Sequence, residues 1–419
     1  MRTYETTIFT CASAISHFYT IFASMKQILT TIFLLCYTLL CITTASAQER
    51  GFNLIVVGDT QPQTETQFKR LEQEVLPNIR QIIDEYRSSS NLPIAILLTG
   101  DVVWDNMAFL PRCKELFESL DVELITVIGN HDHDRDIEGE ESLKEQAYEA
   151  TFGARYKSFT LGDTRFILLD NILYRGYEDY SIELDKEQQK WLRGTAKDIA
   201  KNERIAICMH APAYNFRKGK TMPYARNIMR LFRGNELHFI TGHRHRHATM
   251  ELSKNSIEHS VAQVCGNLWF APICTDGTPP GVLCIEERNN VWQWHFRTFD
   301  TEQSKLRVWP EGKVKDNEEY VVVKVIGWDD KHSVEWLEDG KDMGTMEQIT
   351  ILDPDYIYYV ENEANYNDII MNRLRRSAAP HSHYFRCKRT KQNSEITIVV
   401  TDRFGHNHTQ NLKYYYRQQ

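Results

Sequence analysis

Residues 124–132 read Leu-Ile-Thr-Val-Ile-Gly-Asn-His-Asp, and this stretch decides the fold. Its first five residues are apolar or β-branched, which is typical of a short strand buried on both faces. The next four are a glycine and three side chains that can bind cations or move protons. In open α/β sheets, ligands bind beyond the carboxyl ends of the strands. The stretch therefore predicts one side of a ligand site.

The same arrangement recurs along the first half of the chain. There are six short apolar runs: Leu54–Val57, Ile94–Leu98, Leu124–Ile128, Phe166–Leu169, Ile205–Met209 and Leu237–Ile240. Five of them are followed by polar residues suited to metal binding or catalysis: Asp59 and Gln61, Asp101, Asn130 with His131 and Asp132, His210, and His243 with His245. An aspartate after one strand is usually a turn residue, and a lone histidine is usually structural. The ordered set across five strand ends indicates one shared site.

Helical patterns separate these runs in the first half of the chain. Phe68 to Tyr86 and Tyr224 to Phe232 show apolar residues at three- and four-residue steps, and alternation with strands favours an α/β domain. After residue 257 this periodicity fades, and the apolar runs fit strands. They are a hairpin, Val282–Glu286 with Val291–Phe296, followed by Tyr320–Ile326, Ser333–Glu338, Ile357–Val360 and Glu395–Val400. We predict an α/β domain over 48–257 and a smaller, mostly β domain over 258–419.

Composition narrows the class of protein. The chain has 419 residues, of which 42% are hydrophobic and 25% charged, as in globular proteins. Its net charge of −8 argues against a general nucleic-acid-binding surface, because phosphate backbones attract basic surfaces. The nine cysteines include no Cys-x-x-Cys pair, which argues against a zinc ribbon or a thioredoxin-like site.

The N-terminal segment has the features of a secretory signal. Met25-Lys26 precedes an uncharged, largely apolar run that ends in Ala45-Ser46-Ala47. We predict a signal peptide within residues 1–47, with Met25 as the true start, and no stable membrane span after cleavage. An uncleaved anchor is the alternative. Export permits disulfides, but sequence does not give their pairing; Cys208, inside an apolar run, is expected to be a buried thiol.

The order of the polar motifs resembles the calcineurin-like metallophosphoesterase superfamily over about residues 52–250. The best matches are Gly129–Asp132 and Gly242–His245, and Asp276–Gly281 is similar to exported members of Bacteroidetes type that carry a C-terminal β domain. The resemblance implies a four-layer α/β/β/α sandwich and two divalent metal ions, Mn, Fe or Zn. Carried over by position, one metal would bind Asp59, Gln61 and His245, the other Asn130, His210 and His243, and Asp101 would bridge both.

One position departs from the family pattern. The first motif usually carries histidine where Gln61 stands, and an amide oxygen is a weaker ligand than imidazole. The resemblance places His131 against the scissile phosphate, where it would stabilise charge or protonate the leaving oxygen. Asp132 is predicted either to orient that ring or to cap a helix, and Asp105 to hold a loop. Arg244 and Arg246 are candidates for lining a phosphate pocket. The alternative, which is more common for arginines in a loop, is that their side chains extend into solvent.

Sequence therefore predicts an exported phosphoesterase. It would hydrolyse a phosphomonoester or phosphodiester by direct attack of a hydroxide that bridges the two metals. The alternatives are a non-catalytic phosphate- or metal-binding surface protein with a β adhesion module, and hydrolysis of a non-phosphate bond on the same scaffold. The expected partner is a phosphate-ester substrate in the periplasm or at the cell surface; sequence does not indicate the oligomeric state.

Overall fold

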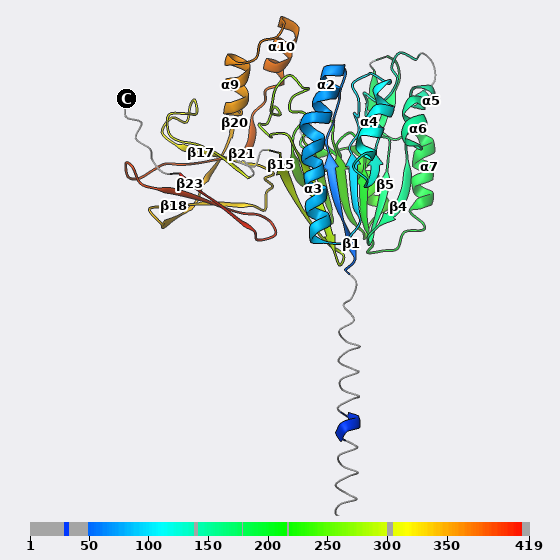
Figure 1. Cartoon of the computed structure of the whole chain (residues 1–419), viewed down its shortest axis with the longest axis horizontal. Helices are drawn as coiled ribbons and strands as arrows, with labels where there is room; N and C mark the ends of the chain where they lie inside the picture. The colour runs from blue at the N-terminus through cyan, green and yellow to red at the C-terminus, as the bar shows by residue number, and fades with distance from the viewer. Residues whose placement is uncertain are drawn as a thin grey trace, which may run out of the picture. The chain divides into compact units, whose positions relative to one another are not determined.

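The computed structural model describes residues 29–32, 49–137, 141–177, 179–215, 218–299 and 305–412 (Figure 1). The predicted signal peptide lies outside the described residues, apart from 29–32. Among the described residues, no helix combines the length and apolar character needed to cross a membrane. The chain divides into two units, Met1–Glu49 and Arg50–Gln419, and everything below concerns the second.

The first sheet has five strands in the order β15-β14-β1-β2-β3. Strand β1 (Gly51–Val57) runs parallel to β2 (Ile94–Leu98), which runs parallel to β3 (Glu123–Thr126). On its other side, β1 pairs antiparallel with β14 (Gly281–Arg288), and β14 forms a hairpin with β15 (Val291–Thr298). The carboxyl ends of β1, β2 and β3, which precede polar residues, therefore lie side by side.

The second sheet has six strands in the order β12-β13-β11-β8-β5-β4. Strand β8 (Arg204–Cys208) lies between β5 (Thr164–Leu168) and β11 (Glu236–Thr241) and is parallel to both. The remaining strands are β4 (Lys157–Leu161), β12 (Ala248–Ser253) and β13 (Ser256–Ser260). All six strands predicted from the apolar runs are present, and the ends of β8 and β11 carry the predicted histidines next to each other.

Alternating side chains of the two sheets build three apolar layers. In β1, Ile55 and Val57 pack with the helices α3 (Leu76–Ser89) and α4 (Phe109–Glu118), whereas Leu54 and Val56 pack against the second sheet. In β8, Ile205 and Ile207 pack with α7 (Lys186–Thr195) and α8 (Pro223–Leu231) on the opposite face. The order helices, sheet, sheet, helices confirms the predicted four-layer sandwich.

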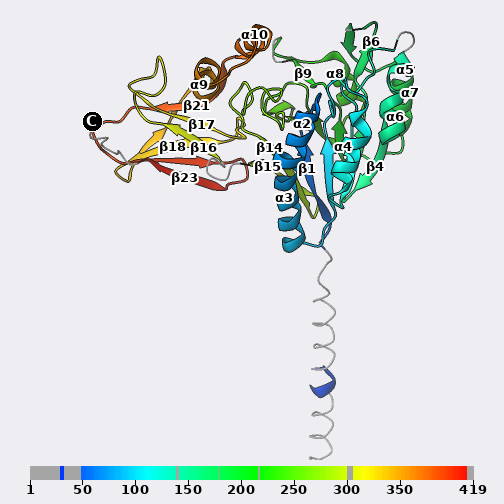
Figure 2. The same cartoon turned by 45° about the horizontal axis from the view of Figure 1, so that its top comes forward.

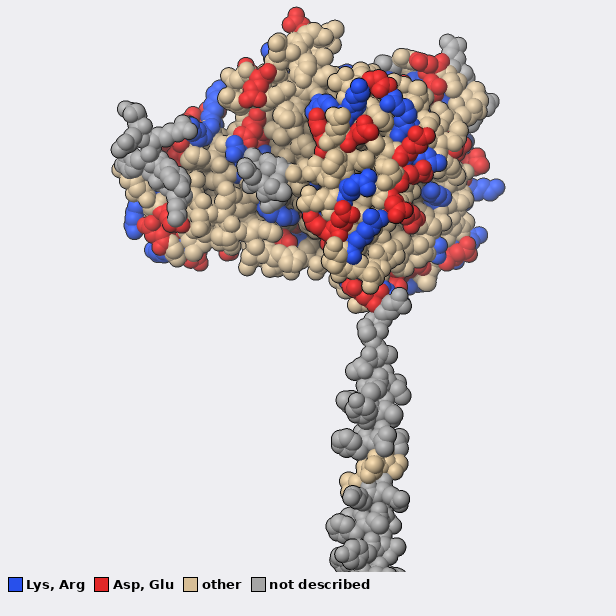
Figure 3. All heavy atoms as spheres, viewed as in Figure 1, with Lys and Arg blue, Asp and Glu red and all other residues tan. Residues whose placement is uncertain are grey.

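Short elements complete this domain. They are α2 (Glu65–Arg70), the π-helical turn η1 (Leu71–Val75), α5 (Glu141–Lys144), α6 (Gln146–Phe152), β6 (Ile172–Tyr174), β7 (Tyr180–Ile182), β9 (Tyr214–Asn215) and β10 (Lys220–Thr221). Basic and acidic side chains are interspersed over the face that carries α2 and α3, with no continuous basic surface there (Figure 3). Within the described residues, all six cysteines are buried free thiols, Cys208 among them.

The C-terminal region is mostly β, as predicted. One sheet contains β16 (Leu306–Trp309), β17 (Val321–Val325), β21 (His381–Cys387) and β20 (Glu347–Ile351). The other contains β19 (Lys341–Thr345), β18 (Ser333–Glu338), β22 (Ile396–Thr401) and β23 (Asn407–Leu412). Val323, Phe385, Trp336 and Ile398 join the two sheets in one apolar core.

Two helices interrupt this β region, and one of them includes a segment that was predicted to be a strand. Residues Ile357–Val360 lie in α9 (Pro354–Asn362), which precedes α10 (Asp368–Ser377) (Figure 2). Their aromatic and β-branched composition favours a strand, but Asp353 caps the helix by accepting a hydrogen bond from the Tyr356 amide at 2.6 Å. Proline at the first helical position adds to that signal, so the capping residues override the local β propensity.

The predicted hairpin of residues 282–296 is confirmed, but it belongs to the α/β sandwich. Strand β14 pairs with β1 from Gly51↔Arg288 to Val56↔Leu283, so the first sheet continues to Thr298 and the small sheets begin at Leu306. The predicted boundary at residue 257 therefore does not coincide with the division between the sheets. Hydrophobic alternation identifies a strand but does not reveal its partner.

This topology predicts how truncated chains behave. A chain ending at residue 257 loses β14, the antiparallel partner of β1, and all but the first two residues of β13, and should not unfold cooperatively. A chain ending at residue 299 keeps both sheets and should retain a cooperative thermal transition. Circular dichroism melting curves would check this, and cooperative unfolding of the shorter chain would contradict the role assigned to the strands after residue 257.

Candidate metal centre

The predicted site residues all lie in loops at the carboxyl ends of five strands. Asp59 and Gln61 follow β1, Asp101 follows β2, Asn130 to Asp132 follow β3, His210 follows β8, and His243 and His245 follow β11. Four have left-handed backbones: Gln61 (φ 42°), Asp101 (φ 50°), His243 (φ 67°) and His245 (φ 53°). Non-glycine residues adopt this conformation at a cost of about 1–3 kcal/mol and cluster at functional sites.

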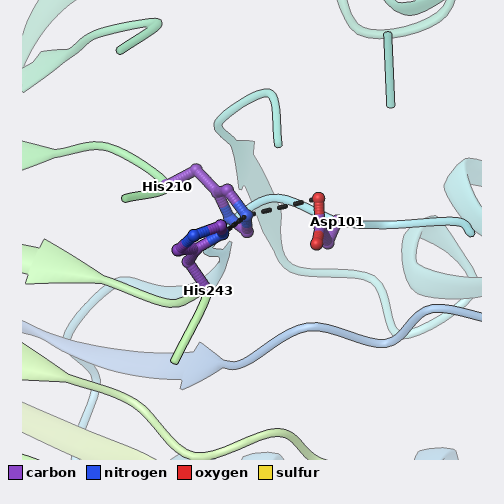
Figure 4. A group of neighbouring side chains, drawn as sticks. All are labelled: Asp101, His210 and His243. Atoms are coloured by element: carbon purple, nitrogen blue, oxygen red, sulfur yellow. Dashed lines mark hydrogen bonds and ion pairs between the residues drawn. The ribbon is translucent and has the colours of Figure 1, made fainter. Parts of the chain in front are cut away.

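The Asp101 carboxylate is the centre of the site. Its Oδ1 accepts a hydrogen bond from the His131 amide at 2.8 Å and lies 3.3 Å from Nε2 of His210. Gly129 makes this approach possible, since a Cβ on it would lie 2.1 Å from the Asp101 nitrogen. Donor atoms of Asp101, His210 and His243 lie within 4.8 Å of one another (Figure 4). The donor atoms of Asp59, Asp101 and His245 lie equally close together. Asp101 is thus shared by two candidate metal groups.

The group of Asp101, His210 and His243 gathers its donor atoms around one point, with Asn130 beside them. Nδ1 of His210 lies 2.8 Å from the Thr99 carbonyl oxygen; because a carbonyl only accepts, this nitrogen carries the proton. Nε2 of His210 lies 3.1 Å from Oδ1 of Asn130, and that oxygen lies 2.9 Å from Nδ1 of His243. Two imidazole nitrogens and an amide oxygen, with the Asp101 carboxylate 3.3 Å from His210, are donor types that divalent transition metals bind. The donor set therefore fits a metal.

Burial sets the charge states of the surrounding groups. It raises the pKa of Asp59 to about 8 and lowers the pKa of His243 to about 3 and of His245 to about 4, which keeps both rings neutral, as metal ligation requires. Burial also opposes the charging of His210, but the Asp101 carboxylate outweighs it and raises the pKa of His210 to about 9.

Gln61 does not present its oxygen to the site. The Leu268 amide donates to Oε1 of Gln263 at 2.9 Å, and Nε2 of Gln263 donates to Oε1 of Gln61 at 2.5 Å. Nε2 of Gln61 in turn donates to Oδ2 of Asp101 at 2.7 Å. The backbone N–H at one end and the carboxylate at the other fix the direction of this chain. Ligation through the Gln61 oxygen, as predicted, would require both amides to turn over and would set N–H against N–H.

His131 is held by Asp105 rather than by Asp132. Nδ1 of His131 lies 2.8 Å from Oδ1 of Asp105, and Arg135 pairs with the other carboxylate oxygen. Asp132 instead accepts hydrogen bonds from the amides of Gly129, at 2.8 Å, and Val103, at 3.0 Å. The predicted orienting role of Asp132 is thus filled by Asp105, and Asp132 shapes the loops. Burial opposes protonation of His131, but Asp101 and Asp105 raise its pKa.

A third cluster, His133, Glu145 and Asp170, has ligand-like spacing but already contains a cation. Nε of Arg155 lies 2.6 Å from Glu145, and its terminal nitrogens lie 3.3 Å from Asp170 and 2.8 Å from Asp185. The guanidinium already pairs with both carboxylates of the cluster, so we assign this cluster as an ion-pair network.

Family models match both parts of the chain. Residues 52–247 match "Calcineurin-like phosphoesterase", and residues 258–408 match "C terminal of Calcineurin-like phosphoesterase". The chain is therefore a phosphoric ester hydrolase with a calcineurin-like phosphoesterase domain. No curated protein matches it.

Solved structures resemble the chain at low identity. A dimetal phosphatase from Danio rerio is 13% identical with a TM-score of 0.40, and the match covers 60% of this chain and 100% of that one. A purple acid phosphatase from yellow lupin (Lupinus luteus) seeds is 14% identical with a TM-score of 0.44, covering 61% and 52%. A 5'-nucleotidase from Candida albicans is 14% identical with a TM-score of 0.39, covering 60% and 52%.

The orientation of Gln61 predicts the effect of its removal on metal content. After Mn²⁺ loading and gel filtration, Gln61→Ala should retain about two metal ions per chain, as in a two-metal site. His245→Ala, which removes a side chain of the candidate group Asp59, Asp101 and His245, should lose about one, because we expect its imidazole to be a ligand. Elemental analysis of the protein peak measures both. Equal metal loss in the two variants would support the original prediction that Gln61 is a metal ligand.

Proposed function

We propose that this chain is an exported, two-metal phosphoesterase that hydrolyses a phosphomonoester or phosphodiester. The observation that carries the proposal is Asp101, whose carboxylate belongs to both candidate ligand groups. A carboxylate has two oxygens and can bridge two cations, whereas a histidine ring nitrogen binds one. We place Asp59, Asp101 and His245 on one metal and Asp101, Asn130, His210 and His243 on the other.

Carboxylate, amide and imidazole ligands without a thiolate suit Mn, Fe or Zn. When bound, two such cations neutralise phosphate charge and lower the pKa of a bound water. Gln61 donates a hydrogen bond to Oδ2 of Asp101 and holds that carboxylate in position. The amide of His131 does the same for Oδ1, so the central carboxylate is fixed from two loops.

We assign the His131 side chain the role of protonating the leaving group. Asp105 holds its Nδ1, which directs Nε2 as the nitrogen that can give a proton to the departing oxygen. The Trp104 ring packs beside it, with centroids 5.4 Å apart, and limits the movement of the imidazole. Asp105 is a positioning residue, because it acts through His131.

Export is part of the proposal and rests on the N-terminal segment. The basic Met25-Lys26, the uncharged run and the Ala45-Ser46-Ala47 terminus favour cleavage after Ala47. The mature chain would then act in the periplasm or at the cell surface.

The first test is metal-dependent turnover. Metal-stripped protein, with Mn²⁺ added back, is assayed with p-nitrophenyl phosphate and bis-p-nitrophenyl phosphate, beside Asp101→Asn. Turnover that needs metal and is lost in the variant supports the proposal, and the preferred ester separates monoesterase from diesterase. Two bound metals without turnover of either ester would favour the non-catalytic binding protein, and no bound metal would reject the two-metal centre.

The roles of His131 and Asp105 predict a dependence on the leaving group. His131→Ala should lower kcat by about 10²–10⁴-fold, the usual contribution of a general acid. The loss should be larger for phenyl phosphate than for p-nitrophenyl phosphate. Phenolate is more basic than p-nitrophenolate and is therefore a poorer leaving group unless it is protonated. Asp105→Asn should give a smaller loss with the same trend, mainly in kcat. Asp121→Asn, on an exposed loop, is the control, and an equal loss for both esters would contradict the general-acid role.

A further inference from the structure

A hollow beside the candidate metal centre is rich in arginine. It has a volume of about 460 Å³ and is lined by ten residues, including His245, Arg246, Arg373 and Arg376. No aspartate or glutamate is among the lining residues. Because His245 belongs to one of the two candidate metal groups, the hollow adjoins the metal centre.

Two of these arginines come from the C-terminal region. Arg373 and Arg376 are three residues apart on α10, so they lie on the same side of the helix. Nδ2 of Asn267 donates to the Tyr356 hydroxyl at 2.7 Å and to Oγ of Ser377 at 3.1 Å. Tyr356 is buried and its hydroxyl also bonds the Leu374 carbonyl at 3.0 Å. These bonds fix α10 against the loop that follows β13.

Further contacts connect the hollow with His131, the proposed proton donor to the leaving group. The Arg373 guanidinium carbon lies 5.1 Å from the Trp104 ring, and the Trp104 ring lies 5.4 Å from the ring of His131. Arg246 follows His245 directly in the chain. A ligand bound at the metal centre can therefore extend toward the arginines without leaving the protein surface.

Three of the arginines that line the hollow have no carboxylate partner among the described residues. Within the part of the chain that the structure describes, Arg246, Arg373 and Arg376 form no ion pair with a carboxylate, and Nε of Arg246 is buried without a hydrogen-bond partner. Guanidinium groups bind phosphate oxygens through paired N–H donors, and Arg246, Arg373 and Arg376 around one hollow, with Arg244 also in its lining, favour a dianion.

We propose that Arg246, Arg373 and Arg376 form a subsite for a second phosphate group, so that the substrate class is a bisphosphorylated molecule with one phosphate at the metal centre. This inference rests on the proposed phosphoesterase function and adds the substrate class. The C-terminal region, through α10, would then determine which esters are hydrolysed.

Matched alkanediol monophosphates and bisphosphates with three to six carbons test the subsite in the full chain loaded with Mn²⁺. We expect the wild type to favour bisphosphates, measured as the ratio of the two kcat/KM values. Arg373→Ala/Arg376→Ala should lower that ratio at least tenfold. The control Arg375→Ala changes a neighbouring exposed arginine of α10 that does not line the hollow, and should keep the ratio. An unchanged ratio in the double variant would overturn the subsite.

Calorimetry separates failure of the subsite from failure of the enzymatic function. In a His131→Ala background, which slows turnover, the same double substitution should weaken bisphosphate binding at least tenfold and monophosphate binding much less. Equal weakening for both ligands would overturn the subsite, because only one of them carries a second phosphate. Retained bisphosphate preference in a wild type that hydrolyses no phosphate ester would support the subsite and reject the phosphoesterase.

Discussion

The buried Asp101 carboxylate is the constraint on which the rest of the site depends. Loops of the first sheet supply its hydrogen bonds, through Gln61 and the His131 amide, and the second sheet supplies His210. A buried carboxylate is costly unless it is paired and hydrogen-bonded. The two sheets must therefore pack with their carboxyl ends aligned, and the left-handed backbone of Asp101 and the close approach of Gly129 follow from that alignment.

Sequence predicts those site residues that a short stretch of neighbouring residues identifies. Strand ends are visible because apolar runs stop at polar residues, and this locates Asp59, Asp101, Asn130, His131, His210, His243 and His245. The contacts that tune these residues join distant positions: Asp105 and His131 are 26 residues apart, and Gln61 and Gln263 are 202 apart. Asp132 illustrates the limit, since it adjoins His131 in sequence but turns to the backbone of Gly129 and Val103.

The loop between β13 and β14 couples the C-terminal region to the metal centre. Gln263 orients Gln61, Nε1 of Trp269 donates to the Thr60 carbonyl at 2.9 Å, and Asn267 holds Tyr356 of α9. Leu268 and Trp269 adopt left-handed backbones (φ 55° and 63°), which costs about 1–3 kcal/mol each and is offset by these contacts. The region after residue 257 thus contributes to the shape of the first ligand loop, which an appended adhesion module would not do.

Charge places a further condition on the substrate. The chain carries a net charge of −8, so an anionic ester gains no long-range attraction from the molecule as a whole. At physiological ionic strength charges are screened beyond about 8 Å, so bound metal ions and the arginines of α10 would act only on a ligand already in contact with them. Recognition must then come from the fixed spacing between the metal centre and the arginines. That spacing depends on the bonds of Asn267 to Tyr356 and Ser377, so a specificity determinant lies in a part of the chain that contributes no metal ligand.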